Sequence, residues 1–532
     1  MSTERKYLFG ILSLALVLRA ITLARIDPVA FDSALYFEIA GFIETGKWAA
    51  ALAYPFPPLY PALIAALASA GMTPDTAGLV VSFASGILAM FPLVIITRAL
   101  AGEKAALWAA FLWAIHPYAI RLSVRALSDM PAAFLVSLSL WAGLRGVQSG
   151  RYFWAIGAGA LSGLAYLTRP EGIEPALGLA ALSAASLAST FTKRGLSNGS
   201  RPFLRQAGWI AAPLLGCAVV AAPYVAFISL EAGAFTFSKK KSPSAMVLSI
   251  APREETKTPA SPPTSGQERA SAKIQESRPD AAAIPKTGWV QRTARNIYVF
   301  QQPFLNGIHL IILLPALLAP WGLRTNRTSE PAGIAGLLLG LTLLHLIVLV
   351  GVAALQGAAY LGGHHVFLMV LYMTPFAGAG LAAAFDRASM KAPGARWAPA
   401  ATAALLIAVT LPSSVFRRPE SGKVFRTAGL WIRDHSAAPP TVITNSPKLA
   451  YHAGAPRVPL SGDAKSIVDL ARKTGADFIV FEPDSTGATS GDFQAQVDSG
   501  ALEVAETFSE RSRSKVYTVV LYRVRQPVSR EQ

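Results

Sequence analysis

Two acidic residues stand where the chain leaves long apolar stretches, and basic residues lie close to one of them. Asp32 lies in "FDSALYFEIAGFIETGKW", residues 31–48. Asp129 follows Arg121 and Arg125 at intervals of four residues in "HPYAIRLSVRALSDMP", so a helix there would gather the three side chains on one ridge. A carboxylate can remove a proton from a hydroxyl group, and a guanidinium can hold a phosphate. These residue types indicate a base beside an anion-binding surface.

Further cationic or proton-handling groups follow later in the chain. Arg169 lies in "LTRPEG", and His364 and His365 stand at the mouth of a late apolar stretch. Glu171 and Glu174 come just after Arg169, where they can cap the next helix or bind a divalent cation. No tight spacing of ligands supports a metal, so no cofactor is predicted and a divalent cation stays an open alternative.

Aromatic residues surround the first acid. If residues 31–45 are helical, Asp32 and Tyr36 share one face, which predicts an amphipathic helix on the membrane surface. The next segment, "YPFPPLYP", spans residues 54–61, and its prolines exclude a regular helix. We expect Tyr36, Tyr54 and Tyr60 to form an aromatic platform in the plane of the membrane. An acceptor molecule, whose hydroxyl group gives up the proton, could bind on this platform. Asp27 and Glu38 are expected to be solvated.

Composition identifies a polytopic α-helical membrane protein. The 532 residues are 52% hydrophobic and only 15% charged, whereas soluble proteins carry about 25% charged residues. Each span needs about 20 largely apolar residues. This rule predicts eleven spans, near residues 7–25, 79–97, 105–120, 129–146, 153–168, 172–191, 207–229, 305–323, 331–352, 364–385 and 397–413.

Basic residues fall on alternate loops, which the positive-inside rule assigns to the cytoplasm. The N-terminus is then cytoplasmic, and an uncleaved first span follows it. The external regions include the first loop, residues 26–78, and the tail after about residue 413. The cytoplasmic loops carry Arg5, Lys6, Arg98, Lys104, Arg145, Arg151, Lys193, Arg194, Arg201, Arg205, Arg324, Arg327, Arg387, Lys391 and Arg396.

Two external regions differ from the membrane module, residues 1–413. Residues 238–288 are rich in Ser, Pro, Ala and Lys, which predicts a disordered insert. Residues 420–532 alternate β-type runs with helical stretches, which predicts a small soluble extracytoplasmic α/β domain.

The chain has no Walker motif, and the basic residues behind its net charge of +17 are scattered between apolar runs. Neither ATP chemistry nor nucleic-acid binding is therefore supported. Its one cysteine, Cys217, is expected to pack inside a span.

The order of these motifs resembles a known family. A span is followed by an Asp with Tyr and "A..I.TG.W", then "PP.YP", an acid in a short second loop, and "LTRPEG". This order is similar to the bacterial membrane glycosyltransferases of the C superfold (GT-C), in the dolichyl-phosphate-mannose protein mannosyltransferase-like branch, family 39. The motifs agree over roughly residues 7–190, and the rest agrees by topology.

The resemblance implies transfer of a sugar from a polyprenyl-phosphate donor to a lipid, glycan or protein acceptor, at the outer face of the bacterial cytoplasmic (inner) membrane. It places the family's two loop acids at Asp32 and Asp129. Many relatives have Asp-Glu where this chain has Asp32-Ser33. The expected phosphate ligands are Arg121, Arg125, Arg169, His364 and His365, and in-line attack would invert the anomeric centre.

Two other classes of function remain open from the sequence. A lipid or glycan transporter, or flippase, would also be polytopic, but the acids lie on one side and paired inverted halves are not evident. A non-catalytic protein for envelope polysaccharide assembly would account for the tail and the insert, although it leaves the acids and cations unexplained.

Overall fold

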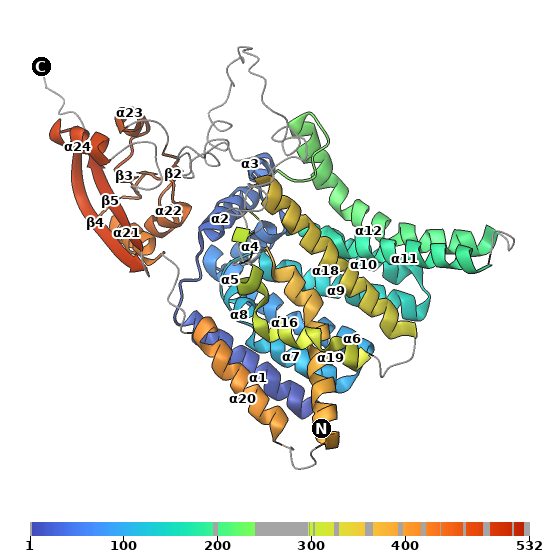
Figure 1. The fold of residues 1–532 in the computed structure, drawn as a ribbon. Coiled ribbons are helices and arrows are strands. Elements are labelled where there is room, and N and C mark those ends of the chain that lie inside the picture. The colour runs from blue at the N-terminus through green and yellow to red at the C-terminus, as the bar shows by residue number, and fades with distance from the viewer. Residues whose placement is uncertain are drawn as a thin grey trace, which may run out of the picture. The chain divides into compact units, whose positions relative to one another are not determined.

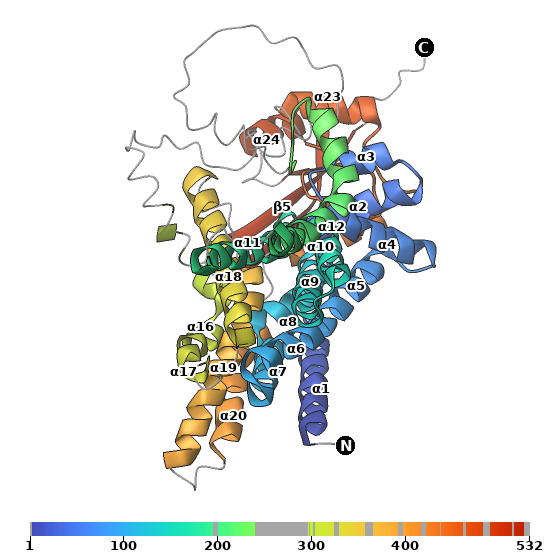
Figure 2. The same cartoon turned by 90° about the vertical axis from the view of Figure 1, so that its right-hand side faces the viewer.

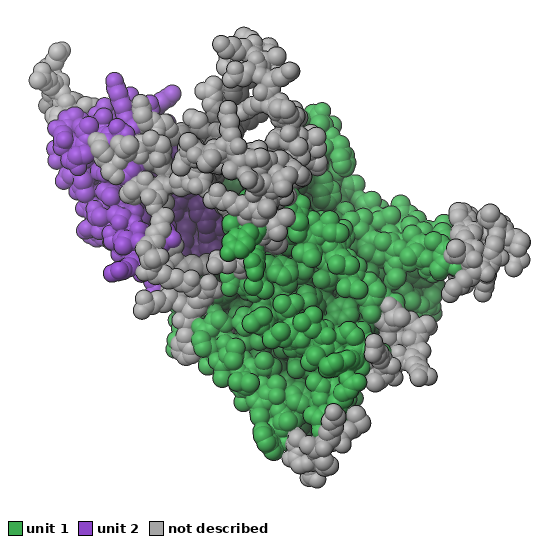
Figure 3. Space-filling view, viewed as in Figure 1, with its two compact units in different colours: residues 1–28, 39–253, 287–417 green, residues 29–38, 254–286, 418–532 purple. Residues whose placement is uncertain are grey.

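The computed structural model describes residues 3–194, 200–239, 296, 298–299, 301, 304–323, 329–356, 365–391, 397–415, 422–436, 438–460, 464–481, 490–512 and 515–525. The chain divides into two compact units (Figure 3). The first contains residues 1–28, 39–253 and 287–417, and the second contains residues 29–38, 254–286 and 418–532. Residues 240–288 of the predicted insert lie outside the described residues.

The first unit is built from helices (Figure 1). One helix, α2, Phe31–Glu44, begins in the second unit and ends in the first. The other helices of the first unit are α1 Thr3–Leu23, α3 Trp48–Ala53, α4 Leu59–Ser69, α5 Pro74–Leu88, α6 Met90–Ala101, α7 Glu103–Ile115, α8 Pro117–Ser123, α9 Asp129–Ser149, α10 Tyr152–Tyr166, the 3-10 helix η1 Pro170–Ile173, α11 Glu174–Arg194, α12 Ser200–Ala232, α16 Leu310–Leu317, α17 Ala319–Leu323, α18 Ser329–Gln356, α19 Phe367–Lys391 and α20 Ala398–Ser414. Figure 2 shows α16 and α17 alongside α19.

Long apolar helices make this a polytopic membrane protein. In the described part of the chain seven helices are long and apolar enough to cross a membrane, or eight if α7 and α8 form one bent span. The predicted spans 305–323 and 397–413 correspond to shorter apolar helices, and 153–168 corresponds to the 15-residue α10. The count of eleven therefore stays a prediction.

The bend between α7 and α8 has a local cause. His116 precedes Pro117, which disfavours helical geometry, and its backbone is extended at φ −64° and ψ 122°. The two helices meet at 59°. Arg19, fully buried on α1, donates from Nε to Ser123 Oγ at 3.1 Å and from Nη1 to the Ala114 carbonyl at 3.3 Å. Because Ala114 lies in the last turn of α7, the cation caps that helix end and holds α1 against the bend.

Small residues let α10 and α12 approach closely. A Cβ added to Gly159 would lie 2.0 Å from the Pro213 carbonyl oxygen, and one added to Gly163 would lie 2.9 Å from that of Cys217. Membrane helices commonly associate through such residues. Cys217 is buried in this contact.

The second unit contains a five-stranded sheet in the order β2-β1-β3-β5-β4. Strand β1 is parallel to β2 and β3, whereas β5 is antiparallel to β3 and β4. Along β3, Phe478 and Val480 pack on one face and Ile479 and Phe481 on the other, as the two-residue period of a strand requires. The elements are α21 Lys423–Asp434, β1 Val442–Ile443, α22 Pro447–Ala453, β2 Arg457–Val458, α23 Ala464–Thr474, β3 Phe478–Phe481, α24 Ser490–Asp498, β4 Leu502–Ser512 and β5 Lys515–Val524.

Candidate active site

Asp129 and Arg169 form a nearly buried ion pair in the first unit. Arg169 Nη1 donates to Asp129 Oδ1 at 2.8 Å, and the side chains are 12% and 5% exposed. Arg169 Nε also lies 3.5 Å from Glu171 Oε2. The structure thus brings together two residues that the sequence assigned to a site, and it places a guanidinium between two carboxylates.

The predicted ridge of Arg121, Arg125 and Asp129 is wrong, because the helix is interrupted. Helix α8 ends at Ser123, and α9 begins at Asp129. The residues between them bond to other elements: Ala126 N donates to the Pro28 carbonyl at 3.0 Å, and Ser82 Oγ donates to the Leu127 carbonyl at 2.9 Å. These tertiary bonds replace the helical ones. Asp129 consequently reaches Arg169.

The "LTRPEG" turn presents Arg169 through local chemistry. Pro170 disfavours helical geometry at Arg169, whose backbone is extended at φ −150° and ψ 139°. A Cβ on Gly172 would lie 2.2 Å from the Ala165 carbonyl carbon, so only glycine fits against the end of α10. Ser162 Oγ donates to the Gly172 carbonyl at 2.7 Å and fixes the turn. The Arg169 side chain therefore projects from a rigid turn.

Glu174, immediately after this turn, anchors a buried polar triad. It is 4% exposed; its Oε1 lies 2.5 Å from His345 Nδ1, and its Oε2 accepts from the Tyr372 hydroxyl at 2.9 Å. His345 and Tyr372 come from α18 and α19 and were missed from the sequence. The available signal was a histidine inside the apolar run "LLHLIVL", since ionisable residues within spans are rare and often functional.

The hydrogen bonds of His345 indicate that the His345–Glu174 pair has no net charge. His345 Nε2 lies 2.7 Å from the His365 carbonyl oxygen, which only accepts, so Nε2 bears a hydrogen. Nδ1 and Glu174 then share a single proton, as carboxyl and neutral imidazole or as carboxylate and imidazolium. Either form sums to zero charge, which lowers the cost of burial. The triad ties the Arg169-bearing segment to α18 and α19.

Replacing Tyr372 by phenylalanine should destabilise the protein by about 1–3 kcal/mol, because one buried carboxylate oxygen loses its hydroxyl donor. The measurement is thermal unfolding of purified protein in detergent. Tyr7→Phe is the matched control, since Tyr7 is 61% exposed. Equal melting temperatures for the two variants would contradict a stabilising triad.

Asp32 lies in the first turn of α2, which confirms the predicted helix to within one residue. Its side chain is half-buried. Ser33 Oγ accepts from the Ala30 backbone N–H at 2.9 Å, so Ser33 caps the helix, and the positive helix end favours the neighbouring carboxylate. Asp32 belongs to the second unit, whereas Asp129 and Arg169 belong to the first.

The remaining predicted cations have varied surroundings. The Arg121 guanidinium lies 4.5 Å from the centroid of the Tyr118 ring and donates to the Ser413 carbonyl at 3.5 Å. Arg125 is half-buried in the segment between α8 and α9. His365 is half-buried and offers its carbonyl to the triad. His364 lies outside the described residues.

The three platform tyrosines lie in different environments. Tyr60 is fully buried, and its hydroxyl lies 2.9 Å from the Gly78 carbonyl and 3.0 Å from Ser82 Oγ, which gives it a packing role between α4 and α5. The helix α4 starts at Leu59, so the end of "YPFPPLYP" is helical; proline is tolerated in a first turn. Tyr54 is half-buried with its ring 6.1 Å from that of Phe42. Tyr36 is 4% exposed in the second unit.

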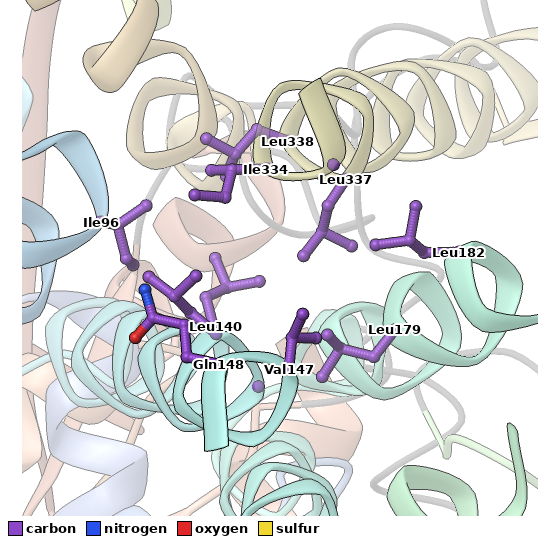
Figure 4. A pocket seen from close by; sticks show the side chains of 12 residues that line it. Ile96, Leu140, Val147, Gln148, Leu179, Leu182, Ile334, Leu337 and Leu338 are labelled. Carbon is purple, nitrogen blue, oxygen red and sulfur yellow. The ribbon is translucent and has the colours of Figure 1, made fainter. Parts of the chain in front are cut away.

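Within the described residues no group of three or more His, Cys, Asp or Glu side chains could hold a metal ion. An apolar pocket opens between α6, α9, α11 and α18 (Figure 4). Its lining includes Leu140, Leu179 and Leu337, with Gln148 as a polar member, and it contains no titratable side chain.

Comparisons with known proteins identify the fold. Residues 56–214 match the family model described as dolichyl-phosphate-mannose-protein mannosyltransferase. ArnT from Cupriavidus metallidurans bound to undecaprenyl phosphate aligns over 97% of this chain and 98% of its own, with a TM-score of 0.54 and 15% identity. The Archaeoglobus fulgidus oligosaccharyltransferase aligns over 90% of this chain and 69% of its own, with a TM-score of 0.51 and 15% identity. No curated protein matches. The chain thus has the GT-C fold, and its residues 56–214 are similar to the mannosyltransferase family, as the motif order predicted.

Proposed function

From this relationship we propose that the chain transfers a sugar from a polyprenyl-phosphate carrier to an acceptor hydroxyl at the outer face of the cytoplasmic membrane. The observation that carries the proposal is the buried Asp129–Arg169 pair, which lies within the stretch that matches the family model. The ArnT structure contains undecaprenyl phosphate, the carrier without a sugar, which makes a sugar linked to a polyprenyl phosphate the donor to test.

The proposed reaction is a direct displacement at the anomeric carbon, with Asp32 as the general base. Asp32 takes the proton of the acceptor hydroxyl, whose oxygen attacks the anomeric carbon while the bond from that carbon to the phosphate oxygen breaks. The polyprenyl phosphate leaves with the bonding electrons. Direct attack opposite the leaving group inverts the anomeric centre. A hexose or a pentose satisfies this chemistry equally.

The cations divide between two tasks in this proposal. Arg169 holds Asp129, because its guanidinium is already shared with that carboxylate. Arg121 and Arg125 bind the donor phosphate, since each guanidinium offers five N–H donors and a fork that fits a phosphate. Asp129 orients the acceptor. His365 contributes through the triad that fixes the Arg169 segment.

The experiment is sugar transfer in proteoliposomes that contain the purified chain and a radiolabelled polyprenyl-phosphate sugar. Label should pass from the lipid donor to an acceptor in a membrane extract. Movement of intact donor between leaflets without cleavage would identify a transporter or flippase and would reject the transferase.

We further propose that the first loop and the sheet-containing unit are extracytoplasmic, on the evidence of the basic-residue asymmetry. In a Cys217→Ala background, Thr45→Cys and Ser499→Cys should react with an impermeant maleimide in intact spheroplasts. Ser149→Cys, at a position that is also exposed and is predicted to be cytoplasmic, should react only after lysis. The reverse labelling pattern would overturn the orientation and the external site.

A further inference from the structure

The N-terminal half of α2 is part of the same compact unit as the sheet near the C-terminus. Residues 29–38 group with residues 418–532, although about 380 positions separate them in the chain; both are purple in Figure 3. Asp32 lies in this short segment. The proposed base, Asp32, therefore lies on a part of α2 that packs within the same compact unit as the C-terminal part of the chain.

Two side-chain contacts hold the helix against the sheet unit. Arg457 donates from Nε to Glu38 Oε1 at 3.2 Å and from Nη2 to Oε2 at 3.4 Å. The two side chains are 9% and 28% exposed, so the expectation that Glu38 is solvated is wrong. The Phe37 ring stacks at a tilt on Tyr451, with centroids 4.9 Å apart. A bidentate pair beside an aromatic contact fixes orientation as well as distance.

The partners of α2 stand on well-supported elements. Tyr451 lies on α22, whose N-cap Ser446 accepts from Leu449 N at 3.3 Å. Arg457 begins β2, which pairs in parallel with β1. Leu449 is fully buried in the core of the unit. The contact surface for α2 is consequently anchored to the sheet.

The contacts of Phe37 and Glu38 lie on the side of α2 opposite Asp32. At about 100° per residue, Phe37 and Glu38 stand about 140° and 240° around the helix from Asp32. Their midpoint is about 190° away, almost diametrically opposite. The sheet unit therefore holds the back of the helix and leaves the carboxylate on the other face.

We propose that the C-terminal unit positions Asp32 for proton transfer, with Arg457 and Tyr451 as positioning residues that act through Glu38 and Phe37. The inference rests on the proposed function, because it assigns a role relative to the base. A loosened α2 leaves the donor site intact but misplaces the carboxylate, and small misplacements of a reacting group can cost about 10²-fold in rate.

The test is a charge swap in the full-length protein. Arg457→Glu alone and Glu38→Arg alone should each lower kcat about tenfold, because loss of the ion pair loosens α2 and displaces the Asp32 carboxylate, while KM for the lipid donor stays unchanged. The double variant, Glu38→Arg with Arg457→Glu, should recover most of kcat. Hydrogen exchange of the backbone amides in residues 31–38 should accelerate in both single variants and slow again in the double variant.

A matched control uses another pair of the same unit. Arg525 and Glu503 lie 3.2 Å apart and are more than half exposed, so Arg525→Glu should change neither kcat nor exchange in residues 31–38. Faster exchange with unchanged kcat in the single variants would overturn the positioning role and leave the transferase intact. An active Asp32→Asn enzyme would instead remove the base itself, whatever the exchange result.

Discussion

Replacing Asp32 by asparagine is expected to lower the rate of sugar transfer by about 10²–10⁴-fold, the usual effect of losing a general base. The substitution keeps the size of the side chain and its place in the first turn of α2. Asparagine cannot accept the proton of the acceptor hydroxyl. Donor binding should survive, because the phosphate is assigned to Arg121 and Arg125.

The measurement is transfer from a radiolabelled polyprenyl-phosphate sugar in membranes with matched protein levels. Asp75→Asn is the control, since Asp75 is also half-buried in the first turn of a helix, α5. That variant should keep wild-type activity. An Asp32→Asn rate within about threefold of wild type, far from the loss expected of a base, would exclude Asp32 from proton transfer.

Replacing Asp129 by asparagine is expected to impair both folding stability and transfer. The change removes the negative charge that lies 2.8 Å from the nearly buried Arg169 guanidinium, and breaking a buried pair costs about 3–5 kcal/mol. Transfer should fall as well, because Asp129 is assigned to orient the acceptor. Thermal unfolding and transfer rates of the same preparations measure the two effects.

An exposed pair provides the comparison for Asp129. Lys104 and Asp386 lie 2.6 Å apart with side chains 73% and 55% exposed, so Asp386→Asn should cost at most about 1 kcal/mol. Removing both charges, Asp129→Asn with Arg169→Gln, should recover part of the lost stability, since the Arg169 cation is then no longer buried without the Asp129 carboxylate. Similar melting temperatures for Asp129→Asn and Asp386→Asn would contradict a stabilising buried pair.

Residue types in the sequence marked candidate site residues, but they did not predict which of these residues pair with one another. Asp129 and Arg169 were recognised by residue type and position, but their contact joins residues 40 positions apart and depends on the break between α8 and α9. Periodicity suggested a continuous helix there. The segment between α8 and α9 instead forms hydrogen bonds with Ser82 and Pro28, which interrupt the helix. Local spacing in the sequence contains no information about such distant partners.

Interactions between distant segments were the hardest to foresee. His345 and Tyr372 meet Glu174 across 171 and 198 positions, and each alone resembles an ordinary polar residue within a span. Glu38 finds Arg457 across 419 positions. By contrast, the helix at residues 31–45 and the apolar spans follow from short periodic patterns. The short or bent apolar helices fall below the length rule, so the number of spans stays a prediction.

The most direct test of the proposed transferase is mass spectrometry of envelope glycans, lipids and glycoproteins from a deletion strain of the organism that carries the chain. The proposal predicts that one sugar substituent disappears while its polyprenyl-phosphate donor accumulates. The wild-type chain should restore both to normal, and Asp32→Asn should not. An unchanged envelope with no accumulated donor would contradict sugar transfer from a polyprenyl phosphate.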